Sequence, residues 1–539
     1  MNYAALSYAA LFRATLPETA LEIAALLVIV VDLGFLRKAT LPIRTAFAAV
    51  IGVAGCIAAI WAVYAAGSAG FSAGSDLLLA AGGSAGVAEV SILVLTAITL
   101  LLFVDTGFTR NPGEYVSVVL MAAAGGMIIS AAQDLLVIFI GLELLSLGLY
   151  ILTAFNKQSG KSAEAAIKYY LFGGMSAAFL LFGFSYLYGL SGSTYLPRVI
   201  YGANVTGTQG GAPLLAIALV MIAAGLGFKI AAVPFHLWAP DAYEGAPAPA
   251  AAFIASVSKV ASFALLISVS NAALKYFQIL MRDSHVTGRV GFVYATTGVI
   301  VRGPQHTALN LDDGWGLILV VLSVASMVLG NLAALAQSSV RRLLAYSAVA
   351  HAGYILLGLA FFSRTNASAQ AILYYIVTYG LTTIGAFGVV GVVERATGSD
   401  KLDAFLGLHK RNPLLAAVLL VLFLSLAGIP PLIGFWAKFN LFASVLNPGW
   451  HGFFKGPVSS LPAETLILVA LAIAFSAVSL YYYLQVLKRA YVMPASDESP
   501  INVHPVTLAV LLAIAAAVLV LGCFPALLQS WIAGFYPGM

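Results

Sequence analysis

Apolar windows long enough to cross a lipid bilayer recur along the whole 539-residue chain, separated by short polar or Gly/Pro-containing joints. A helix needs about 20 apolar residues to span the hydrocarbon, and it satisfies its own backbone hydrogen bonds there. The pattern predicts an all-α polytopic membrane protein with 14 transmembrane helices. The predicted spans are 18–37, 45–67, 77–104, 114–131, 134–155, 164–189, 212–236, 248–278, 315–336, 340–361, 370–393, 412–445, 463–489 and 503–533.

Composition and loop charge add an orientation to this prediction. Hydrophobic residues make up 61% of the chain and charged residues only 9%, which is typical of a membrane protein. Lys and Arg are enriched in one set of alternate loops, including those with Arg37, Arg341 and Lys401, so that side is predicted to be cytoplasmic. Both termini are then predicted to face the periplasm, with the first helix retained. The net charge of +5 is spread among loops and does not indicate nucleic acid binding.

Lys229, Lys259 and Lys438 each lie inside a long apolar stretch that is predicted to be a membrane helix, and Glu143 lies inside a fourth. A charged side chain at bilayer depth costs roughly 2.5 to 3.5 kcal/mol on insertion scales, so it needs a partner or a wetted interior. A lysine near a span end can instead extend to the headgroups, but Lys229 and Lys259 have apolar residues on both sides. These four residues are therefore predicted to form a functional site.

Two spans are interrupted by glycine and proline. The first runs from Gly225 through Lys229 to Pro234 and His236, and the second from Gly428 through Pro431 to Lys438. Proline removes a helix hydrogen bond and frees carbonyls, which is tolerated at membrane depth only where protein or water covers them. A pair of broken helices in corresponding positions of two halves is typical of a secondary transporter.

The residue types in these spans suit proton transfer. Glu143 is an acid near the middle of a span, and a buried carboxylate without a cation would simply bind a proton. A lysine partner would keep Glu143 ionised, and imidazoles such as His236 and His351 both give and take protons near neutral pH. Each histidine could equally be a hydrogen-bonded core residue. Lys168 lies five residues into its span and could either join the charge row or reach the interface.

Other polar residues carry weaker signals. Asp134, Asp241 and Glu244 are predicted to cap helices or lie in a loop. The polar stretch 281–314 is too long for an ordinary connection and is predicted to be a peripheral insertion. Cys56 and Cys523 lack the spacing of a metal or redox site and are predicted to be core residues. The chain has no dinucleotide fingerprint, phosphate loop or cysteine cluster, so no cofactor is expected in it.

Several motifs make the sequence similar to a known family. They are Gly-Leu-Glu143-Leu-Leu-Ser-Leu, then Gly-Phe-Lys229-Ile-Ala-Ala-Val-Pro-Phe-His236-Leu-Trp-Ala-Pro, Ser-Lys259, Arg342-Leu-Leu-Ala-Tyr to His351, and Ser425-Leu-Ala-Gly-Ile-Pro-Pro to Lys438. On these residues the chain resembles the subunit N family of proton-translocating NADH:quinone oxidoreductase, respiratory complex I. The resemblance covers about residues 110 to 490.

The resemblance implies a fold and a role for each site residue. It implies two inverted five-helix repeats with two discontinuous helices. Glu143 and Lys229 would form the coupling ion pair, Lys259 the central relay lysine and Lys438 the outer lysine, with Lys168 and His236 at accessory positions. The predicted domains are the N-terminal helices 1–110, a first repeat 111–280, the insertion 281–314, a second repeat 315–490 and a C-terminal helix 491–539.

The resemblance also implies partners and a location. The partners would be other membrane and peripheral subunits of complex I, including the antiporter-like subunit M and small membrane subunits. FMN, iron–sulfur clusters and quinone would be found in partner subunits. The chain would move protons in the bacterial inner membrane. The M-type pattern has glutamate in place of Lys438, and the L-type has a long lateral helix after its last spans, whereas this chain ends at Met539. Both departures favour subunit N.

Two alternatives use the same residues. A subunit of a multisubunit sodium/proton antiporter would need the same charge row without a redox partner. A passive membrane scaffold could keep buried charges only to specify helix packing.

Overall fold

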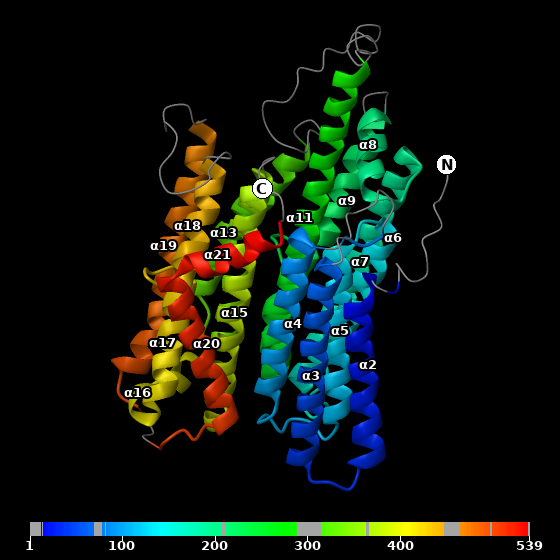
Figure 1. The fold of residues 1–539 in the computed structure, drawn as a ribbon. Helices are drawn as coiled ribbons and strands as arrows, with labels where there is room; N and C mark the ends of the chain where they lie inside the picture. The colour runs from blue at the N-terminus through cyan, green and yellow to red at the C-terminus, as the bar shows by residue number, and fades with distance from the viewer. Residues whose placement is uncertain are drawn as a thin grey trace.

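The computed structural model describes residues 12, 14–68, 78–80, 82–206, 211–287, 314–362, 366–446, 463–495 and 499–536. This part of the chain is helical, and its only β contacts are isolated bridges such as the one between Ser339 and Lys401. Long helices run side by side in one bundle (Figure 1). The predicted all-α membrane architecture is confirmed.

The N-terminal helices are α2 (Leu16–Val30), α3 (Leu41–Ser68) and α4 (Gly83–Phe103). α2 continues into a π-helical turn, η1 (Val31–Phe35), which carries the buried Asp32. The Asp32 carboxylate accepts two hydrogen bonds of 2.7 Å from the Arg44 guanidinium and one of 3.2 Å from the Gly113 amide. A buried carboxylate needs such partners, and these contacts fasten the first span to its neighbours.

Five crossings follow and form the first repeat. Asp134 accepts a hydrogen bond of 2.8 Å from the Leu136 amide at the start of one of them, so the predicted cap is confirmed. A short helix, α8 (Leu196–Thr206), was not predicted. The crossings are α5 (Pro112–Ala131), α6 (Leu135–Thr153), α7 (Gly160–Ser191), the broken pair α9 (Ala212–Ile230) and α10 (Trp238–Gly245), and α11 (Ala248–Thr287).

The second repeat has the same sequence of elements. Two short helices, η3 (Leu402–Phe405) and α16 (Leu408–Arg411), lead into its broken crossing. The five crossings are α13 (Gly314–Leu335), α14 (Val340–Ala360), α15 (Asn366–Thr397), the broken pair α17 (Pro413–Ala427) and α18 (Ile433–Leu446), and α19 (Ala463–Tyr491). Because each repeat has an odd number of crossings, α5 starts at the lower end of the bundle in Figure 1 and α13 at the upper end.

The number of crossings agrees with the sequence prediction. Within the described residues, 12 helices are long and apolar enough to cross a membrane. The α2–η1 segment and the α17–α18 pair bring the total to the predicted 14. The predicted domain boundaries stay a prediction. In the predicted insertion, α11 continues to Thr287, and residues 288–313 lie outside the described part of the chain.

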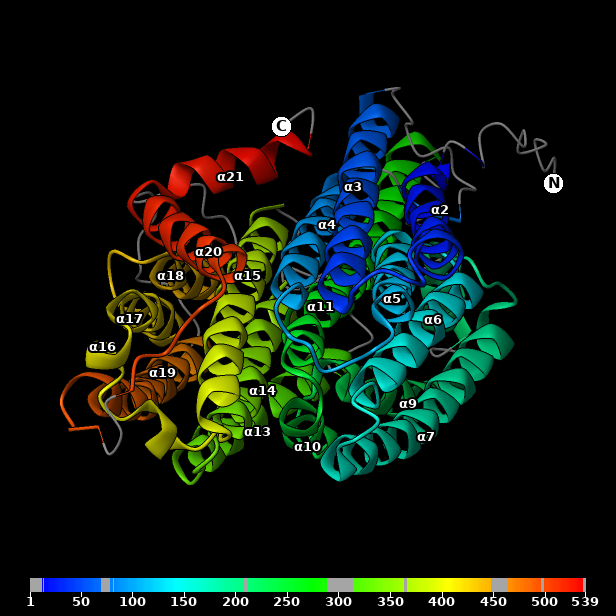
Figure 2. The ribbon, with the colours of Figure 1, turned by 90° about the horizontal axis from the view of Figure 1, so that it is seen from below.

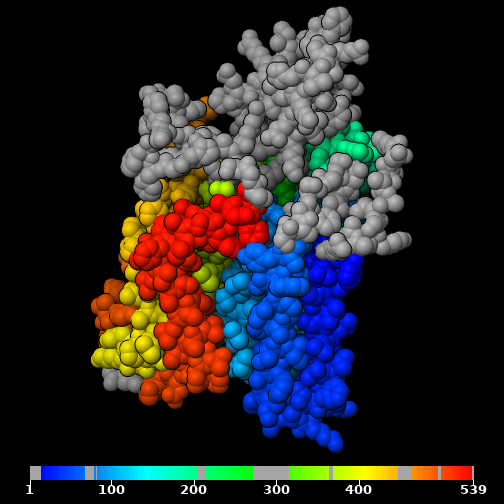
Figure 3. Space-filling view, in the orientation of Figure 1, coloured from blue at the N-terminus to red at the C-terminus, as the bar shows by residue number. Residues whose placement is uncertain are grey.

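The C-terminal span departs from the prediction of one helix over 503–533. The structure has two helices, α20 (Pro505–Cys523) and α21 (Pro525–Gly534), because Pro525 cannot continue the helix before it. α20 rises along the outside of the second repeat, and α21 lies across the bundle beside the N-terminal helices (Figures 1 and 3). Cys523, predicted to be a core residue, is exposed at this bend, whereas Cys56 is buried as predicted.

Helix α11 lies near the middle of the molecule. Seen from below, α4, α11 and α15 separate the first-repeat helices from α17, α18 and α19 (Figure 2). Residues 249–268 of α11 are all buried, and Lys259 lies in the middle of this buried segment. This helix packs against both halves of the first broken helix, α9 and α10, and against α14 and α15 of the second repeat.

Candidate proton-relay site

The first broken helix opens directly after Lys229. Ile230 ends α9, Ala231 takes a left-handed conformation with φ of 56°, and α10 begins only at Trp238. The Trp238 indole donates a hydrogen bond of 2.9 Å to the Phe228 carbonyl, and the Val233 amide donates one of 2.9 Å to Ser326 of the second repeat. These contacts satisfy some of the backbone groups that the proline releases.

Lys229 is 7% exposed and donates a short hydrogen bond to the hydroxyl of Ser146 on α6. Glu143 lies three residues before Ser146 on the same helix and is half-buried. In the described part of the chain, the Glu143 carboxylate and the Lys229 ammonium form no ion pair within 4.0 Å. Lys229 therefore binds a serine one helical turn from Glu143, and the ion pair of Glu143 and Lys229 stays a prediction.

Lys259 joins Lys229 at the same break. Its ammonium donates a short hydrogen bond to the carbonyl of Ile230, the last residue of α9. The carbonyl end of a helix carries partial negative charge, which stabilises a cation there. Lys259 of α11 thus contacts the residue that directly follows Lys229 in the chain.

The second broken helix repeats this arrangement. α17 ends at Ala427, whose carbonyl accepts a hydrogen bond of 2.8 Å from Lys438, and Lys438 also donates one of 2.8 Å to the Ser476 hydroxyl. Gly428 has a φ of 88°, and a Cβ there would lie 3.0 Å from the Lys438 side chain. Glycine is therefore required both by the backbone turn and by the closeness of the lysine.

A buried polar cluster that sequence reasoning underrated lies near Lys438. His351 is 4% exposed, and its Nδ1 lies 2.8 Å from the Tyr375 hydroxyl. Its Nε2 lies 3.5 Å from the hydroxyl of Tyr483, which forms a short hydrogen bond with Ser347. Imidazole and phenol groups in contact can pass a proton between them.

Three further polar residues complete the cluster and were missed in the sequence. Asn331 donates a hydrogen bond of 3.1 Å to the Tyr354 hydroxyl and accepts one of 3.2 Å from Tyr482. The Lys438 ammonium lies 5.7 Å from the centre of the Tyr354 ring, within range of a cation–π contact. The chain has 24 tyrosines, and nothing in their local sequence distinguishes those that face this cluster.

The two accessory residues have different surroundings. His236 lies in the first break against the Tyr346 ring, at 6.1 Å between centroids, and its buried Nδ1 has no hydrogen-bond partner in the described part of the chain. The Lys168 side chain is 43% exposed and pairs with Glu164 at 2.7 Å and with Asp241 at 2.9 Å. Lys168 therefore pairs with two acids that the sequence did not place in the charge row, and its membership of that row stays a prediction.

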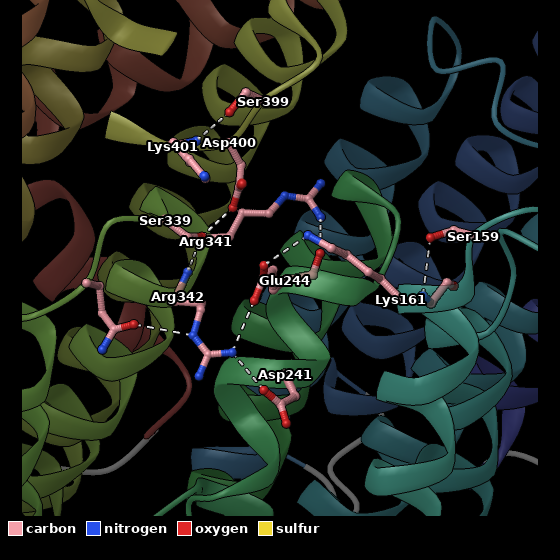
Figure 4. A network of polar contacts seen from close by, with 12 residues as sticks. Ser159, Lys161, Asp241, Glu244, Ser339, Arg341, Arg342, Ser399, Asp400 and Lys401 are labelled. Carbon is pink, nitrogen blue, oxygen red and sulfur yellow. Dashed lines mark hydrogen bonds and ion pairs between the residues drawn. The ribbon is translucent and has the colours of Figure 1, made fainter. Parts of the chain in front are cut away.

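A charge network fastens α10 to the second repeat (Figure 4). Arg342 of α14 pairs with Asp241 at 2.7 Å and with Glu244 at 3.1 Å. The buried Arg341 donates hydrogen bonds of 2.9 and 2.7 Å to the carbonyls of Glu244 and Ala246, and it pairs with Glu394 at 2.8 Å. Asp241 and Glu244 therefore lie in a helix and link the repeats, where capping or a loop had been predicted.

Within the described ranges, no group of three or more His, Cys, Asp or Glu side chains is placed to hold a metal ion. The expectation that FMN, iron–sulfur clusters and quinone belong to other chains stays a prediction.

Comparison with known proteins assigns the chain to a family. A model of the family described as "NADH:quinone oxidoreductase/Mrp antiporter, TM" matches twice, over residues 132–301 and 293–456. NADH-quinone oxidoreductase subunit N 2 of Acidobacterium capsulatum is 44% identical over 538 residues, covering 98% of this chain and 99% of that protein. Subunit N 1 of Roseiflexus castenholzii is 37% identical over 462 residues, covering 83% and 78%.

Solved structures share the fold. A chain of respiratory complex I from Thermus thermophilus with bound aureothin is 30% identical, with a TM-score of 0.71 over 95% of this chain and 98% of that one. A chain of the Mrp complex from Dietzia sp. DQ12-45-1b has a TM-score of 0.71 at 21% identity, over 96% of this chain and 51% of that one, and it shows the fold alone. The predicted resemblance is confirmed: this chain belongs to the subunit N family of NADH-quinone oxidoreductase.

Proposed function

We propose that this chain moves protons across the membrane as the antiporter-like subunit N of NADH:quinone oxidoreductase, while partner subunits pass electrons from NADH to quinone. The proposed relay runs through Glu143, Lys229, Lys259 and Lys438. Lys168 and His236 are proposed accessory groups, the first at the interface and the second inside the break.

The repeated lysine–carbonyl contact at the two breaks is the observation that carries this proposal. In each repeat, a buried lysine donates to the last carbonyl of a half-helix: Lys259 to Ile230 and Lys438 to Ala427. A lysine that only stabilises the fold needs one such contact, whereas a proton relay needs equivalent proton-binding groups along its path. Buried ionisable groups inside a membrane protein commonly mark proton pathways.

The gate of the relay is proposed to be the Glu143–Lys229 pair. In this structure Lys229 donates to Ser146 and Lys259 to the neighbouring Ile230 carbonyl. If the Lys229 side chain moved by one helical turn toward Glu143, the carboxylate would stabilise it as a cation. When Lys229 then left Glu143, this stabilisation would be lost, which would favour proton transfer toward Lys259. Moving one charge against 100 mV costs about 2.3 kcal/mol, so a driven change in the partner subunits must supply the gating energy.

Location and orientation follow from the same proposal. The relatives in complex I imply partner subunits, and we assign this chain to the bacterial inner membrane with subunit M and small membrane subunits as neighbours. The loops rich in Lys and Arg, including those of Arg341 and Lys401, are proposed to face the cytoplasm, and both termini the periplasm.

The antiporter and scaffold alternatives make different predictions. A sodium/proton antiporter would exchange ions in the absence of NADH oxidation. A scaffold would keep its charges for packing alone, so removing a relay charge from an assembled complex would leave pumping unchanged.

Lys229→Ala tests the proposal in inverted membrane vesicles at equal amounts of assembled complex. We expect NADH-driven proton uptake and NADH:quinone activity to fall together by about a hundredfold, the range seen when a proton-transfer group is removed. Lys157→Ala, which removes an exposed lysine from a loop, is the matched control and should retain both activities. Full retention of both in Lys229→Ala would favour the scaffold, and NADH-independent sodium/proton exchange would favour the antiporter.

A further inference from the structure

A row of side chains on α15 leads from Arg395, near the end of the helix, to the His351 cluster. Residues spaced by four are neighbours on a helix surface, and a ridge of such neighbours winds along α15 through Tyr375, Tyr379, Thr383, Phe387, Gly391 and Arg395. At its outer end, Arg395 pairs with Asp105 at 2.9 Å, with both side chains partly exposed. At its inner end, the Tyr379 ring lies 4.8 Å from the His351 ring.

A small cavity opens along the outer half of this row. It has a volume of about 10 Å³ and is lined by Arg395, Gly391, Phe387, Thr507, Ala248 and other small or apolar residues. A volume of about 10 to 15 Å³ admits one water molecule when polar groups are there to bind it. Thr507 provides such a group, because its buried hydroxyl has no hydrogen-bond partner among the described residues.

Two more buried hydroxyls without partners continue inward from the cavity. The Tyr243 ring packs edge-on against Phe387 at 5.6 Å, and its fully buried hydroxyl makes no hydrogen bond within the described part of the chain. The Thr383 hydroxyl, 2% exposed, lies beside Tyr379 but makes no hydrogen bond of standard geometry to any described residue. A buried hydroxyl without a partner costs about 1 to 3 kcal/mol, so water at these positions would remove a large penalty.

The threonine next to Thr383 shows that a buried threonine on α15 need not lack a hydrogen bond. Thr382 is equally buried, and its hydroxyl donates 2.7 Å to the Thr378 carbonyl of its own helix. Thr383 could have formed the same intrahelical bond and does not. Its hydroxyl is therefore left available on the face that leads to Tyr379 and His351.

We propose that Thr507, Tyr243 and Thr383 line a water-filled proton-uptake path from the Arg395–Asp105 face to His351. Protons would pass along hydrogen-bonded water and the hydroxyls to Tyr379 and the His351 imidazole, and each hydroxyl would regain from the outer side the proton it gives up. The Phe387 ring narrows this path beside the cavity. The proposal rests on the proposed proton-pumping function and adds an uptake route that opens in the second repeat.

Thr383→Val and Tyr243→Phe remove the hydroxyls and keep the shapes. In inverted vesicles with equal assembled complex, we expect each variant to slow NADH-driven proton uptake about fivefold, the effect of losing one hydrogen bond from the path. Millimolar formate, a small weak acid that carries protons past a blocked path, should restore part of the rate. Thr382→Val is the matched control and should pump as the wild type does, and Thr383→Ser, which keeps the hydroxyl, should also pump normally.

The outcomes separate this path from the proposed function. Wild-type pumping by both Thr383→Val and Tyr243→Phe, alongside loss of pumping in Lys229→Ala, would overturn the path and leave the relay intact. Equal loss in Thr382→Val and Thr383→Val, without rescue by formate, would also overturn it, because packing would then explain the defect. Wild-type pumping by Lys229→Ala would instead overturn the proposed function.

Discussion

At the residue scale, the buried Lys229, Lys259 and Lys438 donate to neutral oxygen acceptors instead of to an acid. A lone ammonium at bilayer depth is costly, and the carbonyls released by a break supply acceptors with no opposing formal charge. Lys259 and Lys438 each use one such carbonyl, and Lys229 and Lys438 each use a serine hydroxyl. Neutral acceptors leave a lysine freer to lose its proton than a carboxylate partner would.

Gly428→Ala should damage both stability and pumping. At φ of 88° a non-glycine residue costs about 1 kcal/mol, and the new Cβ would lie 3.0 Å from the Lys438 stem. Displacing that lysine should slow NADH-driven proton uptake about tenfold, since relay geometry is sensitive to shifts below 1 Å. Vesicle pumping and thermal unfolding of the complex measure the two effects.

Gly398→Ala is the control for this change. Gly398 has a similar φ of 71°, and its added Cβ would meet nothing within 4 Å. It should lose comparable stability and keep its pumping rate. Equal pumping by both variants would show that the Lys438 position tolerates the shift.

At the element scale, α10 belongs to the first repeat by sequence but is fastened to α14 of the second. Arg341 and Arg342 are neighbours on α14 and reach α10 in different ways: the first contacts mainly backbone carbonyls, and the second contacts carboxylates. A movement of α10 at the first break would therefore displace α14 of the second repeat. The network provides a mechanical link between the two halves.

Arg341→Gln should reduce assembled complex far more than Arg342→Gln. Arg341 is 4% exposed, and breaking a buried charge network typically costs about 3 to 5 kcal/mol. The Arg342 side chain is 30% exposed, and such ion pairs contribute about 0 to 1 kcal/mol each. Native gels and thermal unfolding of detergent-extracted complex compare the two. Similar losses would mean that burial does not set the strength of this network.

At the scale of the whole molecule, the C-terminal helix α21 contacts the N-terminal helices α3 and α4. The Trp531 indole of α21 donates a hydrogen bond of 3.0 Å to Tyr64 on α3, and the Phe535 carbonyl accepts one of 2.9 Å from the Gly83 amide of α4. The Phe535 ring packs 5.6 Å from the Tyr64 ring. These contacts tie the N-terminal helices to the second repeat from outside.

A double-mutant cycle with Trp531→Phe and Tyr64→Phe measures this closure. Each single change should lower stability by about 1 kcal/mol, and the double change by little more than either alone, because they remove one shared hydrogen bond. The midpoint of thermal unfolding of the purified complex is the measurement. Additive losses would show that the two side chains act independently.

The sequence by itself determined the crossings, the two breaks and the buried charges, because each depends on a local property. Apolar length sets a span, glycine and proline set a break, and a lysine among apolar residues is recognisable without its neighbours. Glu143, Lys229, Lys259 and Lys438 could be selected in this way, and both breaks lie where the prolines predicted them.

Only the tertiary structure decided which groups meet. Nothing local indicates that Lys259 reaches Ile230, that Lys229 binds Ser146, or that α10 docks on α14. The second helix at the C-terminus, α21, was missed because an apolar run across Phe524 and Pro525 reads as one span. Which side chains contact one another depends on how helices far apart in the chain pack, and the local order of residues does not determine that packing.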